Sequence, residues 1–308
     1  MAISVDWSDL KSFLDDRKLA AQFVETDSKY IVQGVDGQFT LESILPKGES
    51  DSDTTDFENN YKSGGNKRID TGKDFALSAA AGDVNGDTVV NKFGANPSLS
   101  TSEFVPVWDD GIVYTYLTSA KTLTINRTSE NDKTGGTGAL TVEIQGLDGS
   151  HNEITETVNM NGTTNVTTTN SFLRVNRMVV LTAGSLGEND GDIVIDDSGN
   201  KQAKINKGLN QTLMAIYTVP ANKTAFLKSK YWSIPCNNEI EARLVSREEN
   251  EVFQTKHLLH LQGGYTNHVF GYPVKLEAKA DIQLRAKSLS GSCHSVSAGF
   301  DLILVDNS

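Results

Sequence analysis

The sequence has few cysteines and few prolines, and it lacks a long hydrophobic run. Its 308 residues include 2 Cys and 6 Pro. Two thiols cannot form the disulfide framework of a small secreted domain, and no Cys-x-x-Cys pair is present to bind zinc. No apolar stretch reaches the about 18 residues of a membrane-spanning helix. The first residues also lack the basic and apolar regions of a signal peptide. We therefore expect a chain that is made in a cytoplasm and is not inserted into a membrane.

The two thiols, Cys236 and Cys293, fit two small semi-buried side chains in a reducing compartment. A pairing between them stays open, because both lie in the last part of the chain.

Basic residues are also scarce relative to acidic ones. The chain has 28 Lys and Arg against 40 Asp and Glu, a formal net charge of -12 and a pI of about 4.9. A protein that binds duplex nucleic acid needs clustered Lys and Arg to neutralise phosphates. Because the basic residues here are dispersed among more numerous acids, we expect no nucleic-acid partner, and we interpret the charge as a solvated surface.

What the chain does have is glycine, with 26 residues, and a strong alternation of apolar and polar side chains. In the segment ALTVEIQGL, apolar residues alternate with polar ones as in a strand with one buried and one wet face. The apolar positions are Leu140, Val142 and Ile144, and the polar ones are Thr141, Glu143 and Gln145. Turn-forming Gly, Asn and Asp separate such runs, which predicts a mainly β fold.

Several of these runs also resemble those of a known group. The segments TGGTGALTVEIQGLD and EITETVNMNGTTNVTTTNSFLRVNRMVVLTAGS are similar to a segment common in virion structural proteins of tailed bacteriophages. Three later runs look like the same group: NQTLMAIYTVPANKTAFL, HLQGGYTNHVF and VSAGFDLILVDNS. The resemblance extends over residues 90–308 and implies a particle component such as a decoration, spike or fibre protein. It brings no catalytic residues to this chain.

The first 65 residues differ from the rest and predict a small α+β module. The segment DWSDLKSFLDDRKLAAQFVE has apolar residues near helical spacing, a hairpin is expected from Tyr30–Gln33 and Gln38–Leu45, and a short helix is expected in DTTDFENNYKSGG. A module of this size buries little surface alone, so we expect it to pack on a partner. Residues 66–104 have little periodicity and predict an extended linker or arm, in which DFALSAAAGDV and DTVVNKFG are the best candidates for order.

The remainder predicts two antiparallel β-sandwich or jelly-roll domains, at residues 105–200 and 201–308. The strands expected in the first domain are IVYTYL, KTLTIN, ALTVEIQGL, EITETVNM, SFLRVNRMVVL and DIVIDD, with a Thr-rich hairpin or edge strand in GTTNVTTTNS. Those expected in the second are QTLMAIYTV, KTAFLKSKYWSI, EIEARLVSRE, VFQTKHLLHLQ, NHVFGYPVKLE, DIQLRAKSL and SVSAGFDLILV. The last of these is the most apolar and should lie at the centre of a sheet.

The sharpest local motif is GDVNGDTVVNKFG. Asp83, Asn85 and Asp87 occupy the first, third and fifth positions of an EF-type calcium loop, and the segment looks like the loop of dockerin modules. The match then fails, because Thr88 stands at the position of the turn glycine and Gly94 at that of the terminal acid. We favour a simple turn rich in Asp, Asn and Gly, and assign no metal site.

Histidines and cysteines give no clear site either. His257 and His260 lie in an expected strand, where residues three apart point to opposite faces, and Cys293 and His294 are adjacent and also point apart. No phosphate loop, nucleophile elbow or His-Glu-x-x-His motif is present. We assign no catalytic residue and no cofactor.

Carboxylate pairs and aromatic residues leave two alternatives open. Pairs such as Glu153/Glu156 and Asp109/Asp110 would serve a glycan hydrolase only if a groove held them at catalytic separation. A sugar-binding platform is the second alternative, although we favour core packing for its aromatic residues. These residues are Trp108, Tyr114, Tyr116, Tyr231, Trp232, Tyr265 and Tyr272.

Together these features predict a non-enzymatic structural component of a tailed-phage virion, assembled in the host cytoplasm. The most concrete role is a capsid decoration or a head or neck spike that attaches through its N-terminal module. We expect a homo-oligomer, most simply a trimer, with capsid, neck or tail proteins as its other partners. The alternative is a tail or baseplate fibre that recognises a host surface glycan.

Overall fold

The structure is a computed structural model that shows an almost entirely β protein. It describes residues 21–26, 29–34, 40–42, 75–82, 84, 86–289 and 295–307. The chain divides into two compact units, residues 1–74 with 83–85 and residues 75–82 with 86–308. Within the described residues the regular structure is strand apart from one short helix, α3 (Phe75–Ala80). The predicted mainly β fold class is therefore confirmed. No helix in the described ranges is long and apolar enough to cross a membrane.

In the first unit the described residues form a small antiparallel sheet. Its strands, in the order β1-β2-β3, are β1 (Ala21–Thr26), β2 (Lys29–Gly34) and β3 (Thr40–Glu42). The expected hairpin is confirmed by β2 and β3, which pair Ile31 with Glu42. Residues 21–25 were expected at the end of a helix, and this is wrong, because they pair with β2 instead. The rest of that helix and the second helix of the module lie outside the described residues.

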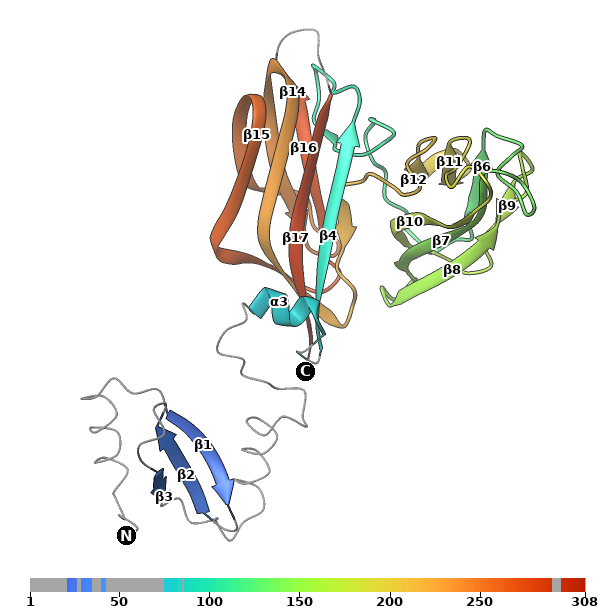
Figure 1. Cartoon of the computed structure of the whole chain (residues 1–308). Coiled ribbons are helices and arrows are strands. Elements are labelled where there is room, and N and C mark those ends of the chain that lie inside the picture. Colours follow the sequence, from blue (N-terminus) through green and yellow to red (C-terminus); the bar gives the residue numbers. More distant parts are fainter. Residues whose placement is uncertain are drawn as a thin grey trace. The chain divides into compact units, whose positions relative to one another are not determined.

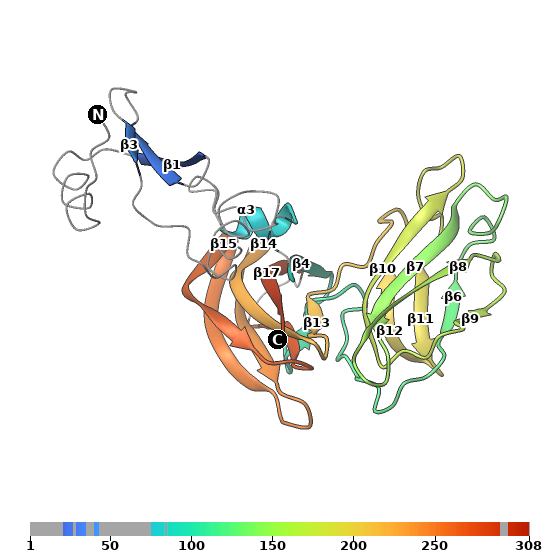
Figure 2. The same cartoon turned by 90° about the horizontal axis from the view of Figure 1, so that it is seen from below.

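The first β core of the second unit consists of two antiparallel sheets that face each other (Figure 2). One sheet has the order β10-β7-β8 and the other the order β12-β11-β6-β9. The strands are β6 (Thr124–Arg127), β7 (Ala139–Leu147), β8 (Glu153–Asn159), β9 (Val166–Thr167), β10 (Arg174–Ala183), β11 (Ile193–Asp197) and β12 (Asn200–Ile205). Two of the three apolar residues expected on the buried face of β7, Val142 and Ile144, are fully inaccessible, whereas Leu140 is only partly buried. The Thr-rich run contributes β9 at the edge of its sheet, as predicted.

The second β core is built by one long, curved sheet. Its order is β13-β16-β14-β17-β4, with β15 added to β14 and β5 added to β16. The strands are β4 (Asp87–Asn96), β5 (Val105–Pro106), β13 (Ile216–Thr218), β14 (Lys223–Arg247), β15 (Gln254–Leu276), β16 (Asp281–Ser288) and β17 (Val296–Asp306). The apolar strand β17 is an interior strand, between β14 and β4, although β14 and not β17 is the central strand of the order.

The two longest strands fold this sheet over on itself (Figure 1). The first part of β14 pairs with β17, and its last part pairs with β16, so both layers share one hydrophobic core. The register of β14 and β15 shifts at the bend, where Gly263 and Gly264 have positive φ of 54° and 80°. Glycine tolerates this backbone conformation at little cost. The sequence predicted four separate strands over this part of the chain. The structure has two, because β14 and β15 each continue through the bend.

The chain passes from the second core into the first core and then returns to the second. Strands β4 and β5 precede the first core in sequence, yet they pair with β17 and β16. The expected boundaries of the β domains and of the linker stay predictions. The strand expected at residues 112–117 is wrong: the segment is not a strand, and its alternation reflects the burial of Tyr114 and Leu117 in the core beside the exposed Ile112 and Val113.

Candidate functional site

The aromatic residues considered for sugar binding separate into two groups. Trp108, Tyr114 and Trp232 are at most 6% exposed and belong to the two hydrophobic cores, as the packing interpretation predicts. Tyr265 and Tyr272 are 67% and 92% exposed. Tyr265 lies beside Tyr231, with ring centroids 6.5 Å apart. Of the seven aromatic residues, the structure therefore leaves Tyr265 and Tyr272 exposed, whereas Tyr231 is half-buried. Tyr116 lines a cavity described below.

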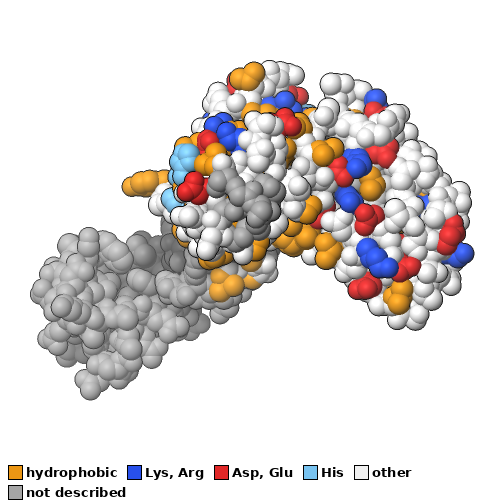
Figure 3. Space-filling model, turned by 90° about the horizontal axis from the view of Figure 1, so that it is seen from above, with side chains coloured by type: hydrophobic (Ala, Val, Ile, Leu, Met, Phe, Trp, Pro, Cys, Tyr) orange, Lys and Arg blue, Asp and Glu red, His pale blue; other side chains and the backbone are white. Residues whose placement is uncertain are grey.

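The two histidines of the sequence motif point to opposite faces of β15. His260 is exposed, whereas His257 faces inward and lies 4.6 Å, between ring centroids, from His268. Its Nδ1 is buried without a hydrogen-bond partner, and burial lowers the pKa of His257, with Lys230 and His268 adding to the effect. Burial also lowers the pKa of Lys230 to about 8. Figure 3 shows histidine atoms at the surface among hydrophobic ones.

The calcium-loop interpretation receives no support from the described residues. Asp87 begins the extended strand β4, which also contains Thr88 and Gly94, while Asp83 and Asn85 lie outside the described residues. No group of three or more possible metal ligands occurs in the part of the chain that the structure describes. The side chain of Cys236, and Cys293 with His294, also lie outside it, so their pairing stays open.

Asp109 and Asp110 are adjacent, but their carboxylates serve different partners. Asp109 is 4% exposed and accepts hydrogen bonds from the Leu213 amide at 2.8 Å and from Asn206 Nδ2 at 2.9 Å. Asp110 forms an ion pair with Lys201 at 2.5 Å. Both carboxylates therefore anchor loops of the first core rather than face a common groove.

Burial raises the pKa of Asp109 to about 7, against an ordinary value of 3.8, although its two hydrogen bonds oppose the shift. The folded protein therefore binds this proton more tightly than the unfolded chain. The resulting stability is fully present below pH 3.8 and is lost as the pH rises through about 7. We expect Asp109→Asn to lose this dependence, measured as urea unfolding at pH 5 and pH 8. An unchanged difference between the two pH values in the variant would contradict the assignment.

The second carboxylate pair is also held apart. Glu153 and Glu156 both lie on β8, where residues three apart point to opposite faces. Glu156 accepts hydrogen bonds from the amides of Thr169 and Asn170 at 2.7 and 2.8 Å. Glu156 therefore fixes a turn, while the exposed Glu153 lines a cavity described below.

The structure instead brings together residues at the junction of the two cores, where the chain crosses twice. The crossings are at residues 107–108 and 214–215, and they pair as a short antiparallel ladder. The Ala215 amide donates to the Val107 carbonyl at 2.8 Å, and the Asp109 amide donates to the Leu213 carbonyl at 3.0 Å. The two connections therefore support each other.

A buried carboxylate completes this junction. Asp281, at the start of β16, is 3% exposed. It accepts hydrogen bonds from Arg174 Nε of β10 at 3.1 Å, from Arg247 Nε of β14 at 2.8 Å and from Thr218 Oγ1 at 2.6 Å. Arg174 also donates to two carbonyl groups of the first core. One carboxylate thus ties two arginines from different cores into a satisfied network.

A cavity of about 520 Å³ opens beside this network. Two guanidinium groups lie over the Tyr116 ring, those of Arg174 and Arg247, at 4.7 and 4.6 Å from the ring centroid. Burial raises the pKa of Tyr116 well above its usual range, so the phenol stays neutral, and its oxygen accepts a hydrogen bond from Gln283 at 2.8 Å. Cation–π contacts of this kind add rigidity to the junction.

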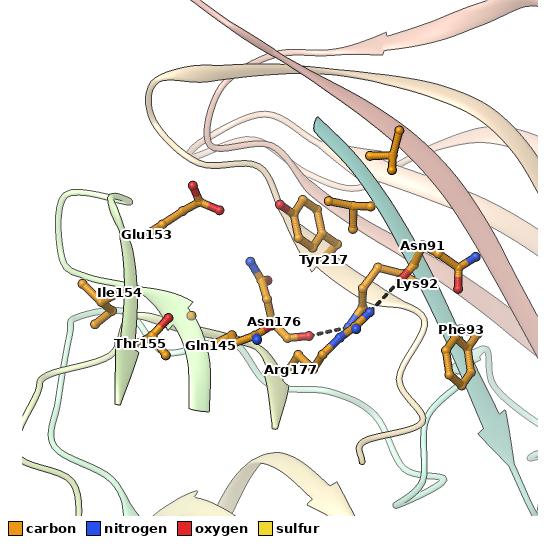
Figure 4. A pocket seen from close by; sticks show the side chains of 13 residues that line it. Asn91, Lys92, Phe93, Gln145, Glu153, Ile154, Thr155, Asn176, Arg177 and Tyr217 are labelled. Carbon is orange, nitrogen blue, oxygen red and sulfur yellow. Dashed lines mark hydrogen bonds between the residues drawn. The ribbon is translucent and has the colours of Figure 1, made fainter. Parts of the chain in front are cut away.

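A second cavity, of about 380 Å³, lies on another side of the junction (Figure 4). Lys92 of β4 is 3% exposed and donates to the Asn176 carbonyl of β10. Burial, reinforced by Arg177, holds the pKa of Lys92 well below its usual range. Arg177 donates to the Asn91 carbonyl at 2.7 Å, and the Asn176 side chain exchanges two hydrogen bonds with the backbone of Thr218. These contacts again join β10 to the second core.

Sequence reasoning missed the buried charged residues Asp281, Arg174 and Lys92 of this junction. Asp281, Arg174 and Lys92 are far apart in the sequence and belong to no motif. One local signal existed for the two buried lysines: Lys92 and Lys230 occupy inward positions in otherwise alternating strands. A charged residue at such a position indicates a buried partner or an incomplete surface.

Comparisons with known proteins give no close relative. No protein-family profile matches the chain, and no curated protein matches it. Among solved structures, the T13 IBDV viral particle is similar at 12% identity, covering 71% of this chain and 69% of that chain, with a TM-score of 0.24. The infectious bursal disease virus Gt strain structure is similar at 10% identity over 72% and 73%, with a TM-score of 0.21. TM-scores this low do not establish a shared fold.

Proposed function

We propose that this chain is a non-enzymatic structural component of a tailed-phage virion. It serves as a capsid decoration or a head or neck spike protein, attached through residues 1–65 and oligomerised through its β domains. The resemblance of its strand segments to tailed-phage virion proteins supports the particle, and the junction of the two β cores supports the structural role.

The observation that carries the structural role is the double linkage of the cores. A protein that bears load on a particle has to keep its parts in one geometry. Two paired chain crossings, the Asp281 network and the Lys92 hydrogen bond all act at the same junction. Buried polar and charged groups with hydrogen-bond partners favour a single arrangement, because any other leaves them unpaired.

We propose a closed homo-oligomer, most simply a trimer, because a sandwich with polar outer faces gains strength from symmetric neighbours. Its contribution to the particle is binding energy from buried interface area. The tail-fibre alternative is favoured by one observation, the exposed Tyr265 and Tyr272. In that alternative these rings stack on a host glycan, and binding to a glycan array is lost when both are changed to alanine.

The proposed function predicts that the chain is a stoichiometric part of purified virions. Quantitative mass spectrometry measures its copies relative to the major capsid protein. Copies comparable in number to that protein indicate capsid decoration, whereas far fewer copies in fixed number indicate a neck, vertex or tail position. Absence from purified particles, or release of reducing sugars from host polysaccharide by the pure protein, contradicts the proposal.

A further inference from the structure

The most exposed hydrophobic side chains gather on one short segment. Among the described residues, the four most exposed large hydrophobic side chains are Tyr272, Val252, Tyr265 and Val269, at 92%, 78%, 67% and 58%. All four lie on β15 or just before it. We call residues 252–276 the β15 surface. Scattered exposed apolar residues are ordinary, but the concentration of the most exposed ones on a single strand and the residues just before it indicates an interaction site.

The β15 surface also differs from the rest of the chain in charge. It contains no Asp or Glu, although the chain has 40 of them, and it carries two lysines and three histidines. The histidine atoms visible in Figure 3 belong to it, because His151 is buried and the other described histidines all lie on β15. A protein with a net charge of -12 repels its own copies over most of its surface. This surface is where two copies can approach without opposing carboxylates.

The backbone and the inner face of β15 are both incompletely covered. In the described part of the chain β15 pairs only with β14, so one edge of a 23-residue strand has unpaired amide and carbonyl groups. Its inward residues Leu259, Leu261, Phe270 and Val274 are only partly buried against the core. The buried His257 Nδ1 also lacks a hydrogen-bond partner here. An edge strand of this length is a template for pairing with another strand.

From these observations we infer that the β15 surface is the contact through which a second copy of this chain binds, edge to edge. A second copy provides what the single chain lacks: a strand edge for the unpaired backbone, apolar area for the exposed side chains and an acid-free face. An antiparallel pairing of two β15 strands satisfies both edges with one set of hydrogen bonds. The inference rests on the self-association in the proposed function, but this two-fold contact by itself gives a dimer and takes the place of the trimer there. It is independent of the virion.

The test is the mass of the purified full-length chain in solution, by light scattering and sedimentation equilibrium. The double variant Val269→Asp/Tyr272→Asp puts two charges on the β15 surface without touching the core. We expect the wild type to be an oligomer and the double variant to be a monomer, with a dissociation constant raised about a hundredfold or more. The control Leu181→Asp changes a side chain of similar exposure, 52%, on β10, and should keep the wild-type mass.

A monomeric wild type at high concentration, or a double variant that keeps the wild-type mass, overturns the inference. So does loss of glycan binding in the double variant with no change in mass, because the surface would then serve a sugar. Equal melting temperatures of the monomeric double variant and the diluted wild-type monomer show that the lost mass is not caused by unfolding. If this test fails, the proposed role in a virion is still tested independently by the copy number of the chain in purified virions.

Discussion

Asp281→Asn should lower the free energy of unfolding by about 3–5 kcal/mol, the cost of removing one partner from a buried ion pair. The Arg174 and Arg247 side chains are only 11% and 26% exposed in their pairs with Asp281. This partial burial limits how far water can replace the lost carboxylate at these guanidinium groups. The amide keeps the shape of the side chain but carries no charge. Urea denaturation followed by circular dichroism measures the loss.

The matched control is Asp197→Asn. Asp197 forms an ion pair with Lys121 at 2.6 Å, with side-chain exposures of 21% and 46%. An exposed pair of this kind contributes about 0–1 kcal/mol, so this variant should stay close to the wild type. Equal losses in the two variants would mean that the Asp281 network does not hold the cores together.

Gly94→Ala should also be strongly destabilising, by about 1–3 kcal/mol or more, because it overpacks a site lined by backbone. A Cβ atom at Gly94 would lie 2.2 Å from the Val107 carbonyl oxygen and 2.6 Å from the Ala215 amide nitrogen. These atoms belong to the two chain crossings and cannot rotate away as a side chain would. We expect a lower melting temperature, and faster hydrogen exchange of the Ala215 amide, which donates to Val107.

The control for this prediction is Gly271→Ala. A Cβ atom at Gly271 meets nothing within 4 Å. Alanine there should be neutral or stabilising by up to about 1 kcal/mol, because it restricts the unfolded chain. If Gly94→Ala were as stable as Gly271→Ala, the close approach of β4 to the crossings would be wrong.

Gly94 also explains why the calcium motif fails where it does. The sequence pattern requires a bidentate acid at this position. The structure has no room for a side chain there, since the chain crossings pack directly on the backbone of β4. The calcium-loop pattern therefore ends at Gly94, a position where close packing of the backbone requires glycine.

Strand positions were predictable from the sequence because alternation is a local property. The segment ALTVEIQGL became β7 without change of bounds, and the apolar C-terminal run became the interior strand β17. Alternation also misled, at residues 112–117, where the chain buries Tyr114 and Leu117 without any pairing strand. A local sequence pattern indicates which side chains are buried, whereas the pairing of strands depends on residues that are distant in the sequence.

The aromatic residues show the same limit. The sequence correctly indicated that Trp108, Tyr114 and Trp232 pack in cores, since most of the aromatic residues fall at alternating strand positions. It did not indicate that Tyr265 and Tyr272 stay exposed, because their segment alternates like the others. Their exposure follows from the position of β15 at a sheet edge, which only the strand order shows.

The sequence by itself determined the mainly β class, the acidic surface and most strand positions, because composition and period-two alternation depend on neighbouring residues alone. The tertiary structure decided which strands pair, where β14 and β15 bend, and which charges meet. Asp281 lies 107 residues from Arg174 in the sequence, and no local pattern links them. Burial makes their contact strong, and burial at that point exists only once the two cores have come together.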